Sequence, residues 1–237
     1  VPSYLPTGGK EGTGMFYVTG DTHGDQCRLI YDSQMGHWSK WDTIFVCGDF
    51  GYLFRNNETE KNFLDDLERQ PFCLCFVDGN HENFPAIYAY PEEMWNGGRI
   101  HRIRRNVIHL MRGQVYTIEG KTFFTMGGAY SIDRCFREKD VSYWEEELPS
   151  QAEYQEALKN LSAHKNQVDY ILTHTAPLPI IHKMGLQPAP GDLELTRFLT
   201  DVYYDVTFRH WYCGHWHKNQ DVTDNFTVLW FDVRELP

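Results

Sequence analysis

The sequence predicts a layered α/β fold, and two observations support that prediction. Short apolar runs recur along the chain, each followed by a glycine-containing loop and then by a segment with helical spacing. This alternation is typical of strands that are joined by crossover helices and stacked in layers. The length of 237 residues fits one large domain better than two small ones, and the 41% of apolar residues can supply its core.

The first part of the chain contains three predicted strands and two predicted helices. Residues 15–19, 43–47 and 72–77 are short apolar runs, and the last run is continuous enough to be covered on both faces. Residues 25–35 follow the first run as a helix. Residues 57–69 follow the second run as an amphipathic helix, with phenylalanine and leucine on its apolar side.

From residue 107 onward the sequence predicts a second, largely antiparallel sheet. Three strands, over residues 107–111, 114–119 and 121–126, are separated by the turn signals Arg112-Gly113 and Glu119-Gly120. The later predicted elements are a helix that runs to about residue 164 behind the capping box Ser150–Glu153, a strand over residues 170–173, a helix over residues 192–204, and strands over residues 209–213 and 227–231.

The composition limits the domain organisation and the partners. Residues 1–14 mix Pro, Gly, Ser and Thr and are predicted to form a flexible tail, whereas residues 15–237 are predicted to form a single domain. The net charge of −11 disfavours a protein that coats nucleic acid, but it permits a phosphate-bearing substrate if bound cations reverse the local field. No run approaches the roughly 18 apolar residues of a membrane span. Six cysteines without a Cys-x-x-Cys pair favour a reducing, cytoplasmic compartment.

Five short motifs carry the side chains that are best suited to binding metal ions. Each motif lies where a predicted strand runs into a loop, and in an open α/β sheet ligands bind beyond the carboxyl ends of the strands. Their aspartates, asparagine and histidines match the ligand count of a two-metal hydrolytic site, and the flanking glycines permit sharp turns. The motifs are Gly20-Asp21-Thr22-His23-Gly24, Gly48-Asp49-Phe50-Gly51, Gly79-Asn80-His81-Glu82, Thr173-His174 and Gly214-His215-Trp216-His217.

These motifs resemble those of the calcineurin-like metallophosphoesterase superfamily, and they span residues 21–217. The resemblance implies a four-layer β-sandwich flanked by helices, with two divalent metal ions at one edge. Mixed nitrogen and oxygen ligands suit manganese, iron or zinc, and we favour manganese. The resemblance further implies that Asp21, His23 and His217 hold one metal, that Asn80, His174 and His215 hold the other, and that Asp49 bridges both.

The resemblance also implies a mechanism. A hydroxide that bridges the two metals attacks phosphorus, and His81 protonates the leaving oxygen. A histidine suits this role because its ordinary pKa lies near working pH. The substrate would be a phosphorylated small molecule, a nucleotide or another exposed phosphoester.

The chain departs from the pattern of the superfamily's protein phosphatases shortly after Asp49. Those enzymes carry an aspartate and an arginine where this chain has Tyr52 and Leu53. The aspartate orients the acid histidine and the arginine binds phosphate. We expect Glu82 or Asp78 to take over the first role, and Arg134 or Arg137, after a glycine-rich loop, to take over the second.

Weaker signals leave several alternatives open. A basic cluster over residues 99–105 either tracks nucleic acid or balances an acidic surface, and the second reading is favoured. Trp216, between two predicted ligands, is the best candidate for a wall of the site, whereas His101 and His109 have no motif around them. A phosphodiesterase or nuclease, a Ser/Thr protein phosphatase, and a non-enzymatic docking module remain alternatives to a phosphoesterase of small substrates.

Overall fold

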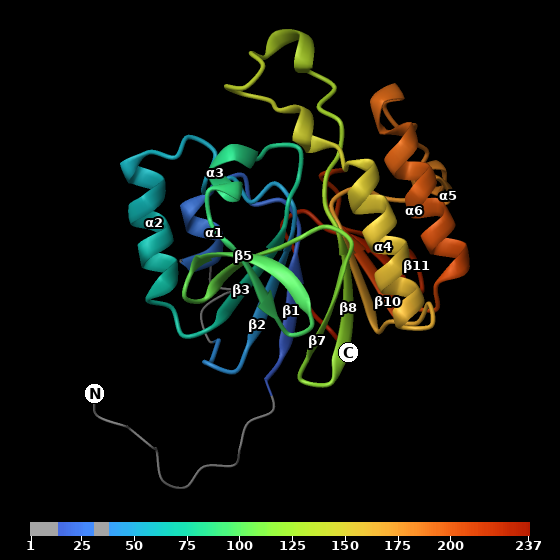
Figure 1. The fold of residues 1–237 in the computed structure, drawn as a ribbon, viewed down its shortest axis with the longest axis horizontal. Coiled ribbons are helices and arrows are strands. Elements are labelled where there is room, and N and C mark those ends of the chain that lie inside the picture. The colour runs from blue at the N-terminus through green and yellow to red at the C-terminus, as the bar shows by residue number, and fades with distance from the viewer. Residues whose placement is uncertain (1–13, 31–37) are drawn as a thin grey trace, which may run out of the picture.

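The structure, a computed structural model, describes residues 14–30 and 38–237. In these ranges the strands form one seven-stranded and one six-stranded sheet, and helices lie on the outer side of each sheet (Figure 1). The mixed α/β class and the helix–sheet–sheet–helix layering are therefore confirmed. Residues 1–13 of the predicted tail, and the end of the helix that was expected over residues 25–35, lie outside the described residues.

The first sheet contains the three apolar strands that were predicted near the N-terminus. Its strands are β1 (Phe16–Thr19), β2 (Thr43–Cys47), β3 (Cys73–Val77), β4 (Glu92–Trp95), β5 (Gly98–Arg104), β6 (Val107–Leu110) and β13 (Val233–Glu235). They lie in the order β13-β1-β2-β3-β6-β5-β4. The central pairs β1–β2, β2–β3 and β3–β6 are parallel, and the outer pairs are antiparallel.

The second sheet differs from the prediction. Its strands are β7 (Gln114–Ile118), β8 (Lys121–Met126), β9 (Tyr170–Thr173), β10 (His210–Cys213), β11 (Gln220–Thr223) and β12 (Phe226–Val228), in the order β11-β12-β10-β9-β8-β7. Only its two outer pairs are antiparallel, so the expectation of a largely antiparallel sheet was wrong.

The error arose at the Arg112-Gly113 turn signal. There the chain passes from the first sheet to the second instead of reversing within one sheet. Strand β6 is fully buried and pairs in parallel with β3, so it belongs to the first sheet. The Arg112 side chain is buried at this crossing, and its guanidinium donates to the carboxylate of Asp78.

Helices cover both outer faces of the sandwich. Ser150 and Glu153 form the predicted capping box, and at the start of another helix the side chain of Asn57 accepts from the backbone of Glu60. The helices are α1 (Gln26–Ile30), α2 (Glu58–Glu68) and α3 (Phe84–Tyr88) on the first sheet, and α4 (Gln151–Ala163), α5 (Leu178–Lys183) and α6 (Leu193–Asp205) on the second; short 3-10 turns cover Arg134–Phe136, Glu145–Glu147 and Pro190–Asp192.

Alternation along the strands builds three apolar layers. On β2, Ile44 and Val46 pack under the helices of the first sheet, whereas Phe45 points into the layer between the sheets. There the ring of Phe45 lies 4.7 Å from that of Phe123 on the opposite sheet. This middle layer holds the two sheets in register, so the carboxyl ends of their parallel strands meet at one edge of the sandwich.

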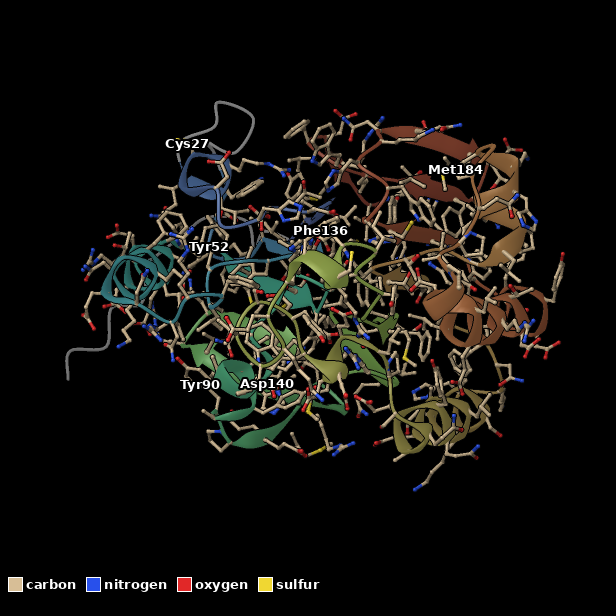
Figure 2. All side chains as sticks on the ribbon, turned by 90° about the horizontal axis from the view of Figure 1, so that it is seen from above. Cys27, Tyr52, Tyr90, Phe136, Asp140 and Met184 are labelled. Carbon is tan, nitrogen blue, oxygen red and sulfur yellow. The ribbon has the colours of Figure 1, made fainter. Side chains whose placement is uncertain are left out.

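The segment between β8 and α4 rises above that edge (Figure 1). It carries Phe136, whose side chain is 90% exposed and which lies near the middle of this end of the molecule in Figure 2. Among the helices of the described ranges, none is long and apolar enough to cross a lipid bilayer.

The basic cluster over residues 99–105 lies mainly on β5. The arginines on β5 are paired with carboxylates of neighbouring elements: Arg99 with Glu92 at 2.8 Å, and Arg104 with Asp65 at 2.7 Å. Arg102 likewise pairs with a glutamate of β4. The arrangement agrees with the favoured interpretation, in which the cluster balances acidic side chains.

Candidate metal centre

Five parallel strands of the two sheets end at the same edge, and each is followed by one of the motifs. In the first sheet, β1, β2 and β3 lead into Asp21, Asp49 and Asn80. In the second sheet, β9 and β10 lead into His174 and His215. The two sheets thus bring together side chains that are far apart in the sequence. All seven predicted ligands lie in this one region.

The backbone at several of these ligands is strained. His23, Asp49, His215 and His217 have φ values of 48°, 47°, 66° and 47°, which is the left-handed region that residues with a Cβ atom seldom adopt. Such conformations cost of the order of 1 kcal/mol each and persist where the surrounding structure requires them. They turn the side chains of the loops toward a common point.

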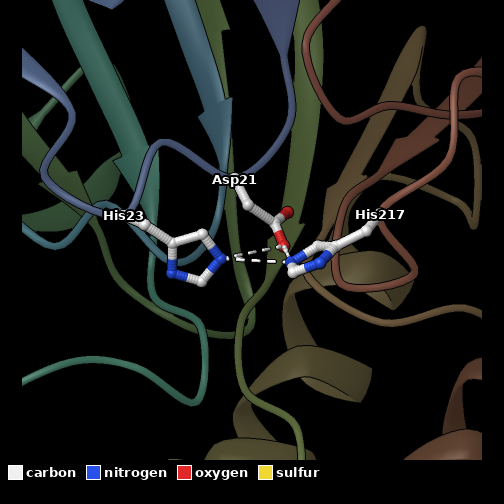
Figure 3. Close-up of side chains that lie close together, drawn as sticks. All are labelled: Asp21, His23 and His217. Atoms are coloured by element: carbon white, nitrogen blue, oxygen red, sulfur yellow. Dashed lines mark hydrogen bonds and ion pairs between the residues drawn. The ribbon is translucent and has the colours of Figure 1, made fainter.

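The first cluster consists of Asp21, His23 and His217 (Figure 3). His217 Nε2 lies 3.1 Å from Asp21 Oδ2 and 3.1 Å from His23 Nε2, and all three ligand atoms lie within 4.8 Å of one another. Two imidazole nitrogens and a carboxylate oxygen that face one another match the donor set of a divalent transition metal. The other oxygen of Asp21 accepts a hydrogen bond from the backbone nitrogen of His215, which holds the carboxylate in place.

The second cluster is built around His174, which is fully buried. His174 Nδ1 donates to the carbonyl oxygen of Cys47 at 2.8 Å, so the lone pair of the neutral ring is on Nε2. Nε2 lies 3.0 Å from Asn80 Oδ1 and 3.4 Å from Asp49 Oδ1. Three acceptor atoms therefore converge, an arrangement that a cation satisfies. His215 lies beside this cluster, and burial lowers its pKa to about 3, which keeps its imidazole neutral.

Asp49 lies between the two clusters. Its Oδ1 faces His174 at 3.4 Å, and its Oδ2 lies 3.7 Å from His23 Nε2. Burial alone would raise the pKa of Asp49, but the surrounding histidines, His174 first, lower it to about 2. The carboxylate is thus ionised at neutral pH and has one oxygen on each side.

Two glycines explain how the ligands approach so closely. A Cβ atom on Gly79 would lie 2.1 Å from Asp49 Oδ1, and one on Gly214 would lie 2.0 Å from Asp21 Oδ1. Both distances are far below van der Waals contact. Any side chain at these positions would occupy the space that the two carboxylates need.

The orientation of Asn80 depends on residues that the sequence did not reveal. Asn80 Nδ2 donates to Ser131 Oγ at 3.0 Å, and Ser131 Oγ donates to the buried carboxylate of Glu147 at 2.8 Å. These hydrogen bonds direct the amide nitrogen of Asn80 away from the centre and its amide oxygen toward His174. Ser131 belongs to the glycine-rich loop before Arg134, but nothing in the sequence connects it with Asn80 or with Glu147.

His81 lies at the open side of the centre. Its backbone nitrogen donates to Asp49 Oδ1 at 2.8 Å, and its ring packs edge-on against His23. Arg137 Nη2 lies 2.9 Å from Nε2 and 3.1 Å from Nδ1 of the same ring. Of the two arginines that were considered as phosphate ligands, Arg137 thus reaches the site. Arg134 instead pairs with the buried carboxylate of Glu147.

Neither carboxylate that was expected to orient His81 does so. Asp78 is buried and accepts from Arg112 Nε at 2.8 Å and from His109 Nε2 at 3.1 Å. Glu82 is also buried and accepts from the backbone nitrogen of Phe50 at 2.6 Å. Both expectations were wrong, because the two carboxylates are occupied by partners inside the first sheet and its loops.

Tyr52 and Leu53, which follow Asp49, and the predicted wall residue Trp216 also have defined places in the structure. Tyr52 and Leu53 are buried, and the hydroxyl of Tyr52 donates to the carbonyl oxygen of Asp25. The ring of Trp216 packs edge-on against His215 and lines a cavity of about 580 Å³ that opens from the centre. Trp216 is therefore positioned as a wall of this cavity.

Comparison with known proteins identifies the family. The family model described as calcineurin-like phosphoesterase matches residues 14–219, a range that contains all five motifs. No curated protein matches the chain. A match over most of the chain, together with the layered fold and the candidate Asp and His ligands, supports metal-dependent hydrolysis of phosphoric esters. The chain belongs to the calcineurin-like phosphoesterase family.

Proposed function

We propose that the protein hydrolyses a small or exposed phosphoester at a centre of two divalent cations. In this proposal Asp21, His23 and His217 would hold one cation, Asn80, His174 and His215 would hold the other, and Asp49 would be shared between them. The observation that carries the proposal is the position of Asp49, which has one carboxylate oxygen toward each cluster. Sharing one carboxylate is how two-metal hydrolytic sites keep their cations close.

The donor set suits manganese, iron or zinc, and manganese is our first choice. When bound, the cations would lower the pKa of the attacking water and neutralise charge that develops on the phosphoryl oxygens. The chain's own contribution is to hold the ligands rigidly. Their left-handed backbones and the hydrogen bond from His174 to Cys47 fix the side chains before substrate arrives.

His81 is proposed as the general acid. Its position beside Asp49 and at the mouth of the cavity lets its imidazole reach the oxygen that leaves phosphorus. Arg137 is proposed as a phosphate ligand, because its guanidinium lies next to that imidazole. A phosphoryl oxygen and a leaving oxygen can then be contacted by neighbouring side chains.

A nuclease, a Ser/Thr protein phosphatase and a docking module receive less support. The arginines of β5 are paired with carboxylates, which weakens the case for a nuclease. Burial of Tyr52 and Leu53, where protein phosphatases of the superfamily carry their aspartate and arginine, weakens the case for a Ser/Thr phosphatase. A docking module without activity would not need His81 beside the shared carboxylate.

The test is turnover of p-nitrophenyl phosphate and of phenyl phosphate with added manganese. We expect His81→Ala to lose about 100-fold or more in kcat. The loss should be larger on phenyl phosphate, because its leaving oxygen is more basic and depends more on a proton donor. His182→Ala, at an exposed position of α5, is the matched control. If the metal-loaded protein turned over neither these monoesters nor a phosphodiester such as bis(p-nitrophenyl) phosphate, the proposed function would be refuted and a docking module favoured.

A further inference from the structure

The candidate metal centre opens into two cavities that share His81. The first, which we name the Arg55 cavity, has a volume of about 410 Å³ and extends past His23 toward Phe54, Arg55 and Thr59. The second, which we name the Leu186 cavity, has a volume of about 580 Å³. Beyond the predicted ligands, its walls include Tyr130, Ile132, Leu186, Pro188, Ala189 and Trp216.

The Leu186 cavity has a predominantly apolar and aromatic wall. Its sides come from three separate parts of the chain: the segment after β8, the segment after α5, and the motif that contains Trp216. Backbone hydrogen bonds hold two of these sides, since Leu186 donates to Ile181 and Tyr130 donates to the carboxylate of Asp192. A preformed apolar cavity with aromatic walls binds planar apolar groups.

The positive charge of Arg137, next to His81, also bears on which phosphoester can bind. Arg137 is the arginine that contacts His81, and its Nε lies 2.8 Å from a carboxylate oxygen of Asp133. Its positive charge is therefore partly compensated before any substrate binds. A phosphodiester carries one negative charge, whereas a phosphomonoester carries up to two. The guanidinium can still donate to a phosphoryl oxygen, which a phosphodiester keeps.

We propose that the substrate is a phosphodiester whose retained substituent, planar and apolar, occupies the Leu186 cavity, while the leaving substituent extends into the Arg55 cavity. This inference rests on the proposed function and narrows its substrate class. A monoester has one substituent and would leave one cavity empty. In the reaction, the oxygen of water forms a bond to phosphorus, the bond from phosphorus to the leaving oxygen breaks, and that oxygen takes up a proton. The products are a monoester and an alcohol.

The experiment compares two diesters, bis(p-nitrophenyl) phosphate and methyl p-nitrophenyl phosphate, which share the p-nitrophenyl leaving group and differ only in the substituent that stays on phosphorus. Leu186→Ser and Ile132→Ser remove apolar side chains from the cavity wall. We expect Leu186→Ser to lower kcat/KM about tenfold on the bis-aryl diester. The loss on the methyl diester should be several times smaller. Comparing each variant with wild type on the same substrate cancels the different intrinsic reactivities of the two esters.

Matched controls use apolar residues of the same neighbourhood that do not line the cavity. Phe136→Ser changes a more exposed side chain on the same segment as Ile132, and Leu193→Ser changes a partly exposed leucine at the start of α6. Both controls should keep wild-type values on both diesters. Circular dichroism and thermal melting would verify that all four variants fold.

Two outcomes would overturn the substrate class while leaving the proposed function intact. In one outcome, Leu186→Ser and Ile132→Ser lower kcat/KM by the same factor on both diesters. In the other, the wild-type protein hydrolyses p-nitrophenyl phosphate but neither diester. Absence of turnover on the monoester and on both diesters, with metals loaded, would instead reject the proposed function itself.

Discussion

Asp49 is the residue on which the arrangement of the centre depends most. Its carboxylate is buried, is ionised because nearby histidines depress its pKa, and faces both ligand clusters. A buried carboxylate is costly unless positive charge compensates it. Two cations would provide that charge from both sides, so Asp49 should matter to both sites together.

We predict that Asp49→Asn loses affinity for both cations at once. The amide keeps the shape of the side chain but removes the negative charge that two metal shells would share. Metal analysis after gel filtration should therefore show less than one equivalent per chain. Asp224→Asn, in the exposed turn between β11 and β12, is the control and should bind as wild type does. Two full equivalents in Asp49→Asn would contradict a shared ligand.

Glu147 should act on metal binding through Ser131 and Asn80. In Glu147→Gln, one acceptor oxygen becomes an amide group and Arg134 loses its buried counterion. The amide of Asn80 is then less firmly oriented. Calorimetric titration with manganese should show one of two sites weakened by about tenfold or more.

The control for this prediction is Glu145→Gln. Glu145 belongs to the same 3-10 turn but is exposed and pairs with Lys139 on the surface. It should leave both manganese affinities as they are. Equal affinities in Glu147→Gln and wild type would show that the hydrogen-bond chain does not position Asn80.

Among the secondary-structure elements, strands β5 and β6 carry polar side chains that are linked by hydrogen bonds and that the sequence did not indicate. His101 Nδ1 and His109 Nδ1 lie 3.0 Å apart, and His109 Nε2 faces Asp78 Oδ1 at 3.1 Å. If His109 donates to Asp78 through Nε2, its Nδ1 accepts from His101. Asp78 in turn accepts from Arg112, so these hydrogen bonds link two strands to the loop that carries Asn80.

The buried ring of His101 should make the protein sensitive to acid. Burial, followed by the neighbouring His109, lowers the pKa of His101 from 6.5 to about 4. The unfolded state therefore binds more protons than the folded state between these values, and stability falls as pH is lowered through this window. In His101→Gln, we expect the loss of unfolding free energy between pH 7 and pH 4 to be smaller by on the order of 2 kcal/mol.

Urea denaturation at several pH values measures the unfolding free energy at each pH. The comparison uses the change in that free energy with pH, so a different stability of the variant at neutral pH does not affect it. His182→Gln, on the exposed side of α5, should keep the wild-type pH dependence. A His101→Gln profile that runs parallel to wild type would show that this ring is not responsible.

In the whole molecule, the candidate ligands divide between the two sheets. Asp21, Asp49 and Asn80 follow strands of the first sheet, whereas His174 and His215 follow strands of the second. The apolar layer around Phe123 connects the two sheets, and the centre is therefore a second connection between them. Metal binding at this edge would join the sheets and stabilise the folded state as a whole.

We predict that removal of metal by a chelator lowers the melting temperature. At a free metal concentration one hundred times Kd, binding at one site contributes about 2.7 kcal/mol to the unfolding free energy. Restoring manganese should restore the melting temperature, and the effect should be largely absent in Asp49→Asn. Identical melting curves with and without chelator for a metal-loaded wild-type protein would contradict this coupling.

Local patterns were sufficient to predict many elements but not how all of them pair. The apolar runs before Asp21, Asp49 and Asn80 became strands, and the capping box at Ser150 began a helix, because strands and helix starts depend on nearby residues. The sheet membership of residues 107–110 was wrong, since strand pairing depends on what lies across the sheet and not on the strand itself.

The sequence by itself determined the chemistry available to this protein: seven side chains that suit metal ions, each after a predicted strand, and a histidine next to one of them. Only the tertiary structure decided which polar groups support that chemistry. Asp78 and Glu82 accept hydrogen bonds from other partners, whereas Arg137 lies beside His81. Ser131 orients the amide of Asn80. The physical reason is that strand ends and ligand types are local properties, whereas hydrogen-bond partners across two sheets arise only from packing.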